Sequence, residues 1–382
     1  MRWIRKSAGS LLVLIAACGR DLGPVSAPPS STPVRGGTIR WATNQQVRTL
    51  DPDIGNDEVS IYVIHSVYDT LVGYEPSDPS RRGSGLKLVP HLATSWTVSP
   101  DHLDYVFTLR DGIAYEDGTR IVAADFKTSL DRAINLKRSA FASYVGDVVS
   151  VAAPDDTHVE IKLSKPYAGF LYVMAMPFAT PIPASHLTAV GDQLRREPLA
   201  SGAWRLAGWD EGQQVVLERN PHYWDPTRPY LDRQILLENI PSDTAYLMFE
   251  QGELDTVDRL PSPVYVWIQE RDDWKPYLHD VGGMNVYGER MNVRVKPFDD
   301  VRVRRALNYA VNKEHIVKLL GGGATISHGL LPPGMVGRDD ALAPYPHDPE
   351  KARALLREAG YPDGFETEYV TTKGDDAEKL AL

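Results

Sequence analysis

Residues 90–135 change their hydrophobic period once, and this change constrains the fold more than any other part of the sequence. Tyr105, Phe107 and Leu109 occupy alternate positions, as in a strand with one buried face. From Val122 the apolar residues recur every three or four positions, which predicts the buried face of a helix. The residues of that face are Val122, Phe126, Leu130 and Ala133. A strand followed by such a helix predicts a mixed α/β domain.

The composition is that of a globular protein with more than one domain. A chain of 382 residues is long enough for two or three domains, and 42% hydrophobic with 24% charged residues is ordinary for them. The formal net charge is -10 and no basic stripe occurs, which argues against a nucleic-acid partner. The acidic balance mildly favours cationic solutes, although solubility explains it equally well.

The usual motifs of catalysis and metal binding are missing from the sequence. There is no G-x-S-x-G elbow, and the ten histidines form no H-x-x-x-H or H-E-x-x-H pair. The triple glycine at residues 321–323 has no Lys-Ser or Lys-Thr after it, so it predicts the end of a helix and not a phosphate-binding loop. We therefore predict that the protein is not an enzyme, uses no cofactor and holds no metal ion.

The N-terminus has the pattern of a targeting segment. Basic residues precede an apolar run of about seven residues, far short of the roughly 20 that span a bilayer. The run ends at Cys18, the only cysteine, in a box that resembles the processing site of bacterial lipoproteins. That resemblance implies removal of a signal peptide (1–17) and lipidation of Cys18; an ordinary signal peptide with a stray cysteine is the alternative. Residues 18–35, rich in Pro and Ser, predict a flexible tether.

Three segments carry patterns that are more specific than periodicity. One, DGT…A.DF..S..R, runs from Asp117 to Arg132. The others are RNPHYW at residues 219–224 and KPFDDVRVRRAL at residues 296–307. Together they resemble the extracellular solute-binding proteins of ABC importers, family 5, the peptide and nickel class. The resemblance covers roughly residues 36–370.

The resemblance implies an α/β protein with the two-lobe periplasmic-binding-protein-like fold, type II, of the three-domain cluster C kind. Domain I would be discontinuous (36–68 and 184–285), and domain II (69–183) would be a small α/β domain inserted into it. Residues 286–382 would form a partial domain III, because family members are usually longer. We therefore expect an incomplete second lobe in an apparently C-terminally truncated chain, whether the truncation is natural, a frameshifted reading or an incomplete record.

Local patterns predict several other elements. Residues 38–43 have the pattern of a first strand. Apolar residues from Val303 to Val317 predict one long helix. Asp348, followed by proline, predicts the start of the last helix, and Gly360 its end.

Five candidate solute contacts come from the resemblance to peptide-binding members. Asn56, Asp57 and Glu58 fall where the loop after the first strand touches a bound peptide, whose unpaired backbone groups such side chains can satisfy. Phe141 would lean an aromatic ring into the cleft, and Met176 would make a pocket wall more apolar. A solvated acidic loop and plain core packing are the respective alternatives.

The function implied by the resemblance is capture of a small solute between two lobes, most simply an oligopeptide or dipeptide. The partners would be an ABC permease and its ATPase subunits. The protein would be an exported, membrane-anchored lipoprotein facing the periplasm or the cell exterior, and a monomer. The alternative is a degenerate or truncated sensor or interaction lipoprotein without a transport ligand. In that case a pull-down with the protein would recover a signalling protein but no permease.

Overall fold

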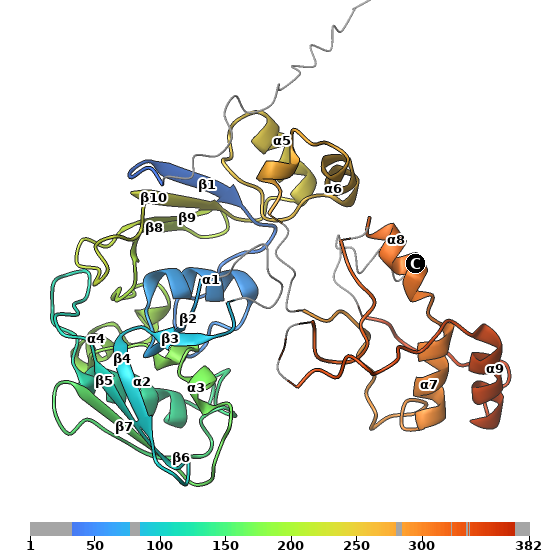
Figure 1. Ribbon diagram of the computed structural model, residues 1–382, viewed down its shortest axis with the longest axis horizontal. Helices are drawn as coiled ribbons and strands as arrows, with labels where there is room; N and C mark the ends of the chain where they lie inside the picture. The colour runs from blue at the N-terminus through green and yellow to red at the C-terminus, as the bar shows by residue number, and fades with distance from the viewer. Residues whose placement is uncertain are drawn as a thin grey trace, which may run out of the picture.

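The computed structural model describes residues 33–370 except 77–84, 280–284, 322, 334 and 336. Figure 1 shows these residues as two bodies that follow each other along the chain. The first body, residues 33–279, contains every strand of the described part. The second body, residues 285–370, contains helices and irregular segments. The two bodies therefore differ in their basic architecture.

The first sheet joins segments that lie far apart in the sequence. Its order is β1-β10-β9-β8, with β1 and β10 parallel and the other neighbours antiparallel. Its strands are β1 (Thr38–Ala42), β10 (Arg233–Leu237), β9 (Gln214–Arg219) and β8 (Trp204–Asp210). Helix α1 (Glu58–Val67) buries Val63, Ile64 and Val67 in one core with residues of this sheet. Chain on both sides of residues 69–183 thus builds one sheet.

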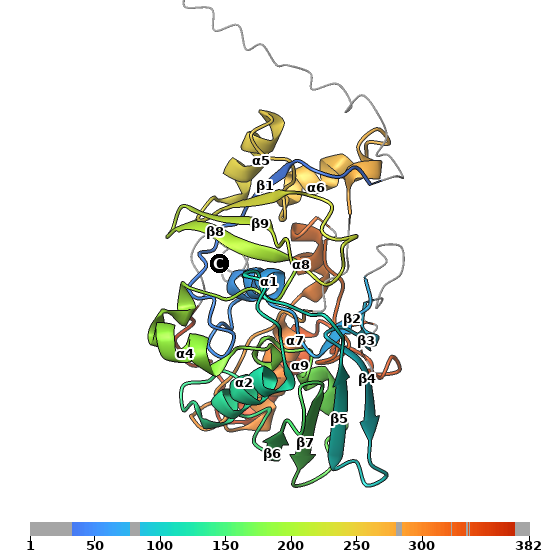
Figure 2. The ribbon, with the colours of Figure 1, turned by 90° about the vertical axis from the view of Figure 1, so that its left-hand side faces the viewer.

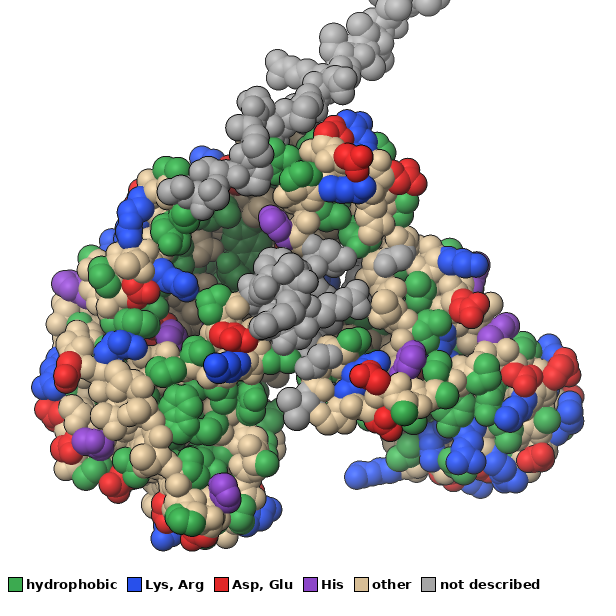
Figure 3. All heavy atoms as spheres, viewed as in Figure 1, with side chains coloured by type: hydrophobic (Ala, Val, Ile, Leu, Met, Phe, Trp, Pro, Cys, Tyr) green, Lys and Arg blue, Asp and Glu red, His purple; other side chains and the backbone are tan. Residues whose placement is uncertain are grey.

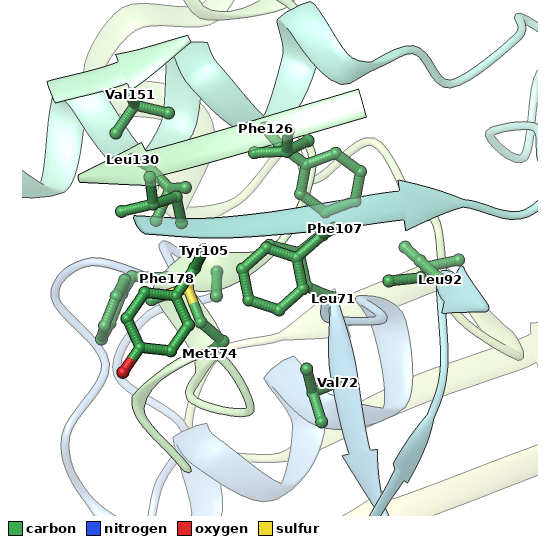
Figure 4. Packing of buried hydrophobic residues seen from close by; sticks show 14 of the residues in the cluster. Leu71, Val72, Leu92, Tyr105, Phe107, Phe126, Leu130, Val151, Met174 and Phe178 are labelled. Carbon is green, nitrogen blue, oxygen red and sulfur yellow. The ribbon is translucent and has the colours of Figure 1, made fainter. Parts of the chain in front are cut away.

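The second sheet is antiparallel throughout, with the order β4-β5-β7-β6. Its strands are β4 (Ala93–Val98), β5 (Asp104–Leu109), β7 (His158–Leu163) and β6 (Val148–Ala152). Tyr105, Phe107 and Leu109 are at most 5% exposed, so the predicted strand period is confirmed. Helix α2 (Ala123–Asn135) covers this sheet, and Figure 4 shows its Phe126 packed next to Phe107.

Shorter elements complete the first body. They are β2 (Val72–Tyr74), β3 (Leu88–Pro90), α3 (Phe170–Val173), η1 (Pro177–Ala179), α4 (Ala184–Val190), η2 (Gly191–Arg195), α5 (Ser242–Glu250), α6 (Ser262–Gln269) and η3 (Lys275–Tyr277). Figure 2 shows α1 between the first and the second sheet, and Figure 1 shows the same order of layers. Helix α1 therefore forms a layer of its own between the two sheets.

The second body contains three helices in its described part: α7 (Val301–Ala310), α8 (Lys313–Leu319) and α9 (Pro349–Glu358). The prediction of one long helix from Val303 to Val317 is wrong, because α7 ends at Ala310. Asn312 begins α8 by accepting a hydrogen bond from the His315 backbone N at 2.9 Å. Asparagine favours such capping positions over helix interiors, and the apolar period does not reveal this competition.

The predicted last helix is confirmed as α9. Asp348 Oδ1 accepts a hydrogen bond from the Lys351 backbone N at 2.9 Å, and Pro349 is the first helical residue. Gly360 lies just beyond the helix with φ at 89°, in the left-handed region that glycine enters at no steric cost. The cap, the proline and the glycine thus have the positions that their residue types favour.

The end of α8 touches the first body. A Cβ atom on Gly321 would lie 2.7 Å from Val266 Cγ2 and 3.3 Å from the Ser262 carbonyl oxygen, both on α6. The φ of Gly321 is 62°, again left-handed. Figures 1 and 2 both show α8 beside α6. Glycine is required here by both the backbone conformation and the close approach.

Candidate functional site

A pair of opposite charges lies where the loop after β1, the start of α1 and the α5–α6 loop meet. Glu58 is the first residue of α1, and its Oε2 accepts hydrogen bonds from Arg259 Nη2 at 2.5 Å and from Gln45 Nε2 at 3.1 Å. The Arg259 side chain is 42% exposed and that of Glu58 is 63% exposed. At such exposure an ion pair contributes only about 0–1 kcal/mol. The ion pair between Glu58 and Arg259 can therefore break at a small cost in free energy, and each group can then pair with a charged solute.

Asp258 adds a second carboxylate to this pair. Its Oδ2 lies 3.9 Å from Arg259 Nε. Burial raises the pKa of Asp258, the charge of Arg259 counteracts that shift, and Glu58 adds to it. Burial alone would lower the pKa of Arg259, but the carboxylates of Glu58 and Asp258 raise it. The charged cluster of Glu58, Asp258 and Arg259 thus has two carboxyl groups and one guanidinium. The carboxyl groups can bind an ammonium group, and the guanidinium can bind a carboxylate.

An aromatic surface borders the charged cluster. Tyr62 lies one turn along α1 from Glu58 and is 47% exposed. Its ring centroid is 4.8 Å from that of Trp41 in an edge-to-face arrangement. Burial and the charge of Asp258 raise the pKa of Tyr62, so this phenol stays neutral. The pair offers an apolar face beside the charges.

The charged cluster lies on the part of the first body that leads to the second. Tyr287, in the segment before α7, is close enough for its phenol to act on the charge of Arg259. A small depression beside Arg259 is lined by Ala42, Thr43, Asn44, Ile240, Ser242, Ala245, Val257 and Asp258. Figure 3 shows the first body hollowed on the face drawn there, with hydrophobic side chains inside the hollow. The cluster therefore lies on a face of the first body that Tyr287 of the second body approaches.

The predicted loop residues divide into one capping residue and two outward-facing ones. Asp57 is the N-cap of α1, and its Oδ1 accepts a hydrogen bond from the Ser60 backbone N at 2.9 Å. Such a cap contributes about 1 kcal/mol to folding, which gives Asp57 a structural task. Asn56 and Glu58 are exposed. Of the three, Glu58 is the one that the structure brings into the charged cluster.

Phe141 and Met176 lie in the core beneath the second sheet. Phe141 is 5% exposed, and its ring centroid is 5.3 Å from that of Phe178. Met176 is half-buried and packs against the same core. As the structure stands, Phe141 offers little surface to a solute. The solute contacts of both residues stay predictions.

Other predicted features fall outside the described residues. The signal peptide, Cys18 and the tether up to residue 32 belong to this part of the chain. In the described ranges, no helix is long and apolar enough to cross a membrane. The same ranges contain no group of three or more His, Cys, Asp or Glu side chains placed to hold a metal ion.

A second hollow lies at the far end of the first sheet and has a different character. Its volume is about 340 Å³, and it is open to solvent. Arg219 and Asp232, which line it, pair with each other at 2.9 Å, and Arg219 also donates to the Tyr230 carbonyl oxygen at 2.9 Å. These charges are engaged in holding the β9–β10 connection. The chemistry of the charged cluster is therefore the better guide to a site than the larger volume.

Nothing in the sequence around Arg259 and Asp258 marks them as site residues. They lie in a loop without periodicity, and Arg259 is 201 positions away from its partner Glu58. An arginine or lysine opposite the acidic residues 57 and 58 would indicate such a site. Only the fold shows that this residue is Arg259.

Comparison with known proteins places the chain in a family. The family model described as "Bacterial extracellular solute-binding proteins, family 5 Middle" matches residues 87–382, and the chain therefore belongs to this family. The glutathione-binding protein GsiB of Shigella dysenteriae is 33% identical over 351 residues, which are 91% of this chain. The chain spans 66% of the length of that relative.

Solved structures confirm the predicted fold class. The protein AgaA from A. tumefaciens R10, in complex with agropinic acid, matches with a TM-score of 0.73 and 27% identity over 86% of this chain and 65% of its own. A periplasmic oligopeptide-binding protein, OppAIV of Borrelia burgdorferi, matches with a TM-score of 0.72 and 25% identity over 86% of this chain and 67% of its own. The chain thus has the mixed α/β fold of periplasmic binding proteins. The domain boundaries stay predictions.

Proposed function

We propose that the chain captures a small solute for an ABC import system and binds it at the charged cluster of Glu58, Asp258 and Arg259. The observation that carries this proposal is an exposed ion pair on the first body, close to Tyr287 of the second, in a member of a solute-binding family. The solute would lie between the bodies and draw them together, since a ligand shifts such an equilibrium by preferring the closed state.

The charges of the cluster favour a solute with both an ammonium and a carboxylate group. The ammonium would pair with Glu58 and Asp258, and the carboxylate with the planar guanidinium of Arg259. An oligopeptide or dipeptide has both groups. Two similar proteins, named as a glutathione-binding and an oligopeptide-binding protein, support this class of solute. Asn56, next to Glu58, would add an amide to the contacts.

The remaining parts of the proposal concern partners and location. Delivery to a permease and its ATPase subunits follows from the family, and lipidation of Cys18 would anchor an exported protein to its membrane. Several acyl chains at one cysteine hold a protein durably, because each buried methylene contributes about 0.8 kcal/mol. Mass spectrometry of the protein purified from bacterial membranes tests the anchor at Cys18.

Calorimetry with a solute panel tests the binding site. The panel contains glutathione, a tripeptide, agropinic acid, and the same tripeptide blocked by acetylation or by amidation. We expect the free tripeptide or glutathione to bind, and Glu58→Gln and Arg259→Gln each to weaken binding at least about tenfold, which is roughly 1.4 kcal/mol. The acetylated peptide should bind wild type and Glu58→Gln equally, because it has no ammonium group.

Asp156→Asn is the matched control for these variants. Asp156 forms an exposed ion pair with Arg120, far from the charged cluster in the hairpin region of the second sheet. This control should bind as the wild type does. Equal affinity of the wild type and both cluster variants for every solute that binds would contradict the site, and no heat with any panel member would contradict the solute class.

A further inference from the structure

Residues that are distant in the sequence meet in a buried cluster of three charges. Arg132 on α2 donates to Asp51 Oδ2 through Nη2 at 2.6 Å and to Asp51 Oδ1 through Nη1 at 2.8 Å. The same Nη1 also contacts Asp53 Oδ2. The Asp51 and Asp53 side chains are 3% and 1% exposed, and that of Arg132 is 18% exposed. The guanidinium is thus shared by two carboxylates almost out of contact with water.

The buried cluster has one negative charge too many when both acids are ionised. Asp53 Oδ1 is buried and accepts no hydrogen bond from the described residues. Asp51, by contrast, has both oxygens on Arg132. A buried charge without compensation is expensive, and the group that is least well compensated takes up a proton instead. In this cluster that group is Asp53.

The buried cluster also fastens the loop of the candidate site to the second sheet's helix. Asp51 and Asp53 lie in the turn that leads from β1 to α1, whose first residue is Glu58. Arg132 lies on α2, on the opposite side of the contact from this turn. After α2, the Ala140 backbone N donates to the Asp53 carbonyl oxygen at 3.1 Å. The position of Glu58 therefore depends on a connection only five to seven residues away.

We propose that Asp53 is a proton-binding site that locks the residue 51–58 loop onto α2 when protonated and loosens it when ionised. Arg132 is a positioning residue in this device, because it acts on the candidate site through the loop and not by contact with a solute. The lock needs no solute, so its test is independent of the proposed function. If that function holds, the same device makes solute binding sensitive to the acidity outside the cell.

Burial determines the direction of the effect, and the neighbouring charges modify it. Burial raises the pKa of Asp53 from 3.8 to about 7, Arg132 lowers it and Asp51 raises it. Tyr68, at the end of α1, faces Asp51 and Arg132, and burial raises its pKa as well, so it remains neutral. Glu116 faces Tyr68 from the loop after β5, and burial raises its pKa. None of these neighbours supplies a second positive charge to offset Asp53.

The linkage to stability has a definite sign. The unfolded chain has Asp53 at the usual pKa near 3.8, whereas the folded chain holds its proton up to about pH 7. The stabilisation is therefore fully present below about pH 3.8 and is lost as the pH rises through about 7. Between pH 6 and pH 8 this one group raises the unfolding constant about tenfold.

Urea unfolding of the full chain at pH 6, 7 and 8 tests the proposal. Wild type should show the roughly tenfold rise in the unfolding constant over this range, and Asp53→Asn should lack it, because asparagine keeps an acceptor for Arg132 but cannot ionise. Asp155→Asn is the control, since hydrogen bonds from Thr157 hold the pKa of the exposed Asp155 low and it stays ionised throughout. This control should follow the wild type.

Two further variants distinguish a proton site from a merely structural contact. Asp51→Asn removes the repulsion on Asp53 and should move the midpoint of the pH effect to lower pH. Arg132→Gln removes the attraction and should move it to higher pH. Loss of packing alone would lower stability in both variants without moving the midpoints in opposite directions.

Hydrogen exchange at the Ala140 amide reports the lock itself. After correction for the intrinsic rate, protection of this amide should fall in wild type as the pH rises to about 7 and level off above it, whereas it should stay constant in Asp53→Asn. If Asp53→Asn does not fold, carboxyl-carbon NMR of wild type and Asp51→Asn answers the question. An aspartate that titrates near pH 7 in wild type and lower in Asp51→Asn supports the proposal. Parallel unfolding profiles of wild type and Asp53→Asn, or no such titrating aspartate, overturn it.

Discussion

The two bodies differ in how much apolar surface they bury. The second sheet and its surroundings form a continuous core that includes Phe107, Phe126 and Phe178, all fully buried. In the described part of the second body, the buried hydrophobic residues are Val303, Ala306 and Ala352. Large side chains such as Leu330 are 90% exposed there. The first body thus has a large hydrophobic core, while the buried residues of the second body belong to the helix pair α7 and α9.

This difference predicts which of the two bodies unfolds more easily. Because burial of apolar surface is the main driving force of folding, the first body should unfold as one cooperative unit. The second body has its close packing between α7 and α9, and its opening free energy should be lower. The candidate site lies on the stable body, close to Tyr287 of the less stable one.

The largest expected effect comes from a core position of the second sheet. Phe107→Ala removes a fully buried ring that packs near Trp96 and Phe126. We expect a loss of about 3–5 kcal/mol in the free energy of unfolding, measured in urea, with the first body affected as a whole. A loss below about 1 kcal/mol would mean that this core does not support the body.

A core position of the second body should have a smaller and local effect. Val303 is fully buried between α7 and α9, and Val303→Ala removes about two methylene equivalents. The expected cost is about 2 kcal/mol, seen as faster hydrogen exchange in α7 and α9. Exchange in the second sheet should not change. Equal acceleration in both bodies would show that they unfold together and would break the comparison.

The contact between the bodies should have the smallest effect. Gly321→Ala places a methyl group 2.7 Å from Val266 Cγ2 on a residue with left-handed φ. The left-handed conformation costs about 1–2 kcal/mol for alanine, and the residue escapes this cost if the bodies separate. Exchange at α8 should therefore rise, while Gly360→Ala, at a left-handed glycine with open space around it, serves as control. Identical α8 exchange in both variants would exclude the contact with α6.

The sequence predicts elements better than it predicts contacts between them. Tyr105, Phe107 and Leu109 reveal β5 because period and burial coincide along one strand. The break before Asn312 is invisible, since the apolar period continues through it while a side-chain cap ends the helix. The pattern that ends at Arg132 is readable by itself, but the ion pair of Arg132 with Asp51 spans 81 positions. The partnership of Glu58 and Arg259 has no local signal at all.

The central claim, that a solute is held between the two bodies, can be tested by one distance measurement. Spin labels at Asp156→Cys and Arg353→Cys, whose native side chains are 67% and 62% exposed, report on the first and second body, with Cys18→Ser removing the native thiol. Double electron–electron resonance should show a shorter distance between the two spin labels when the solute found by calorimetry saturates the protein. An unchanged distance distribution with saturating solute would contradict the account.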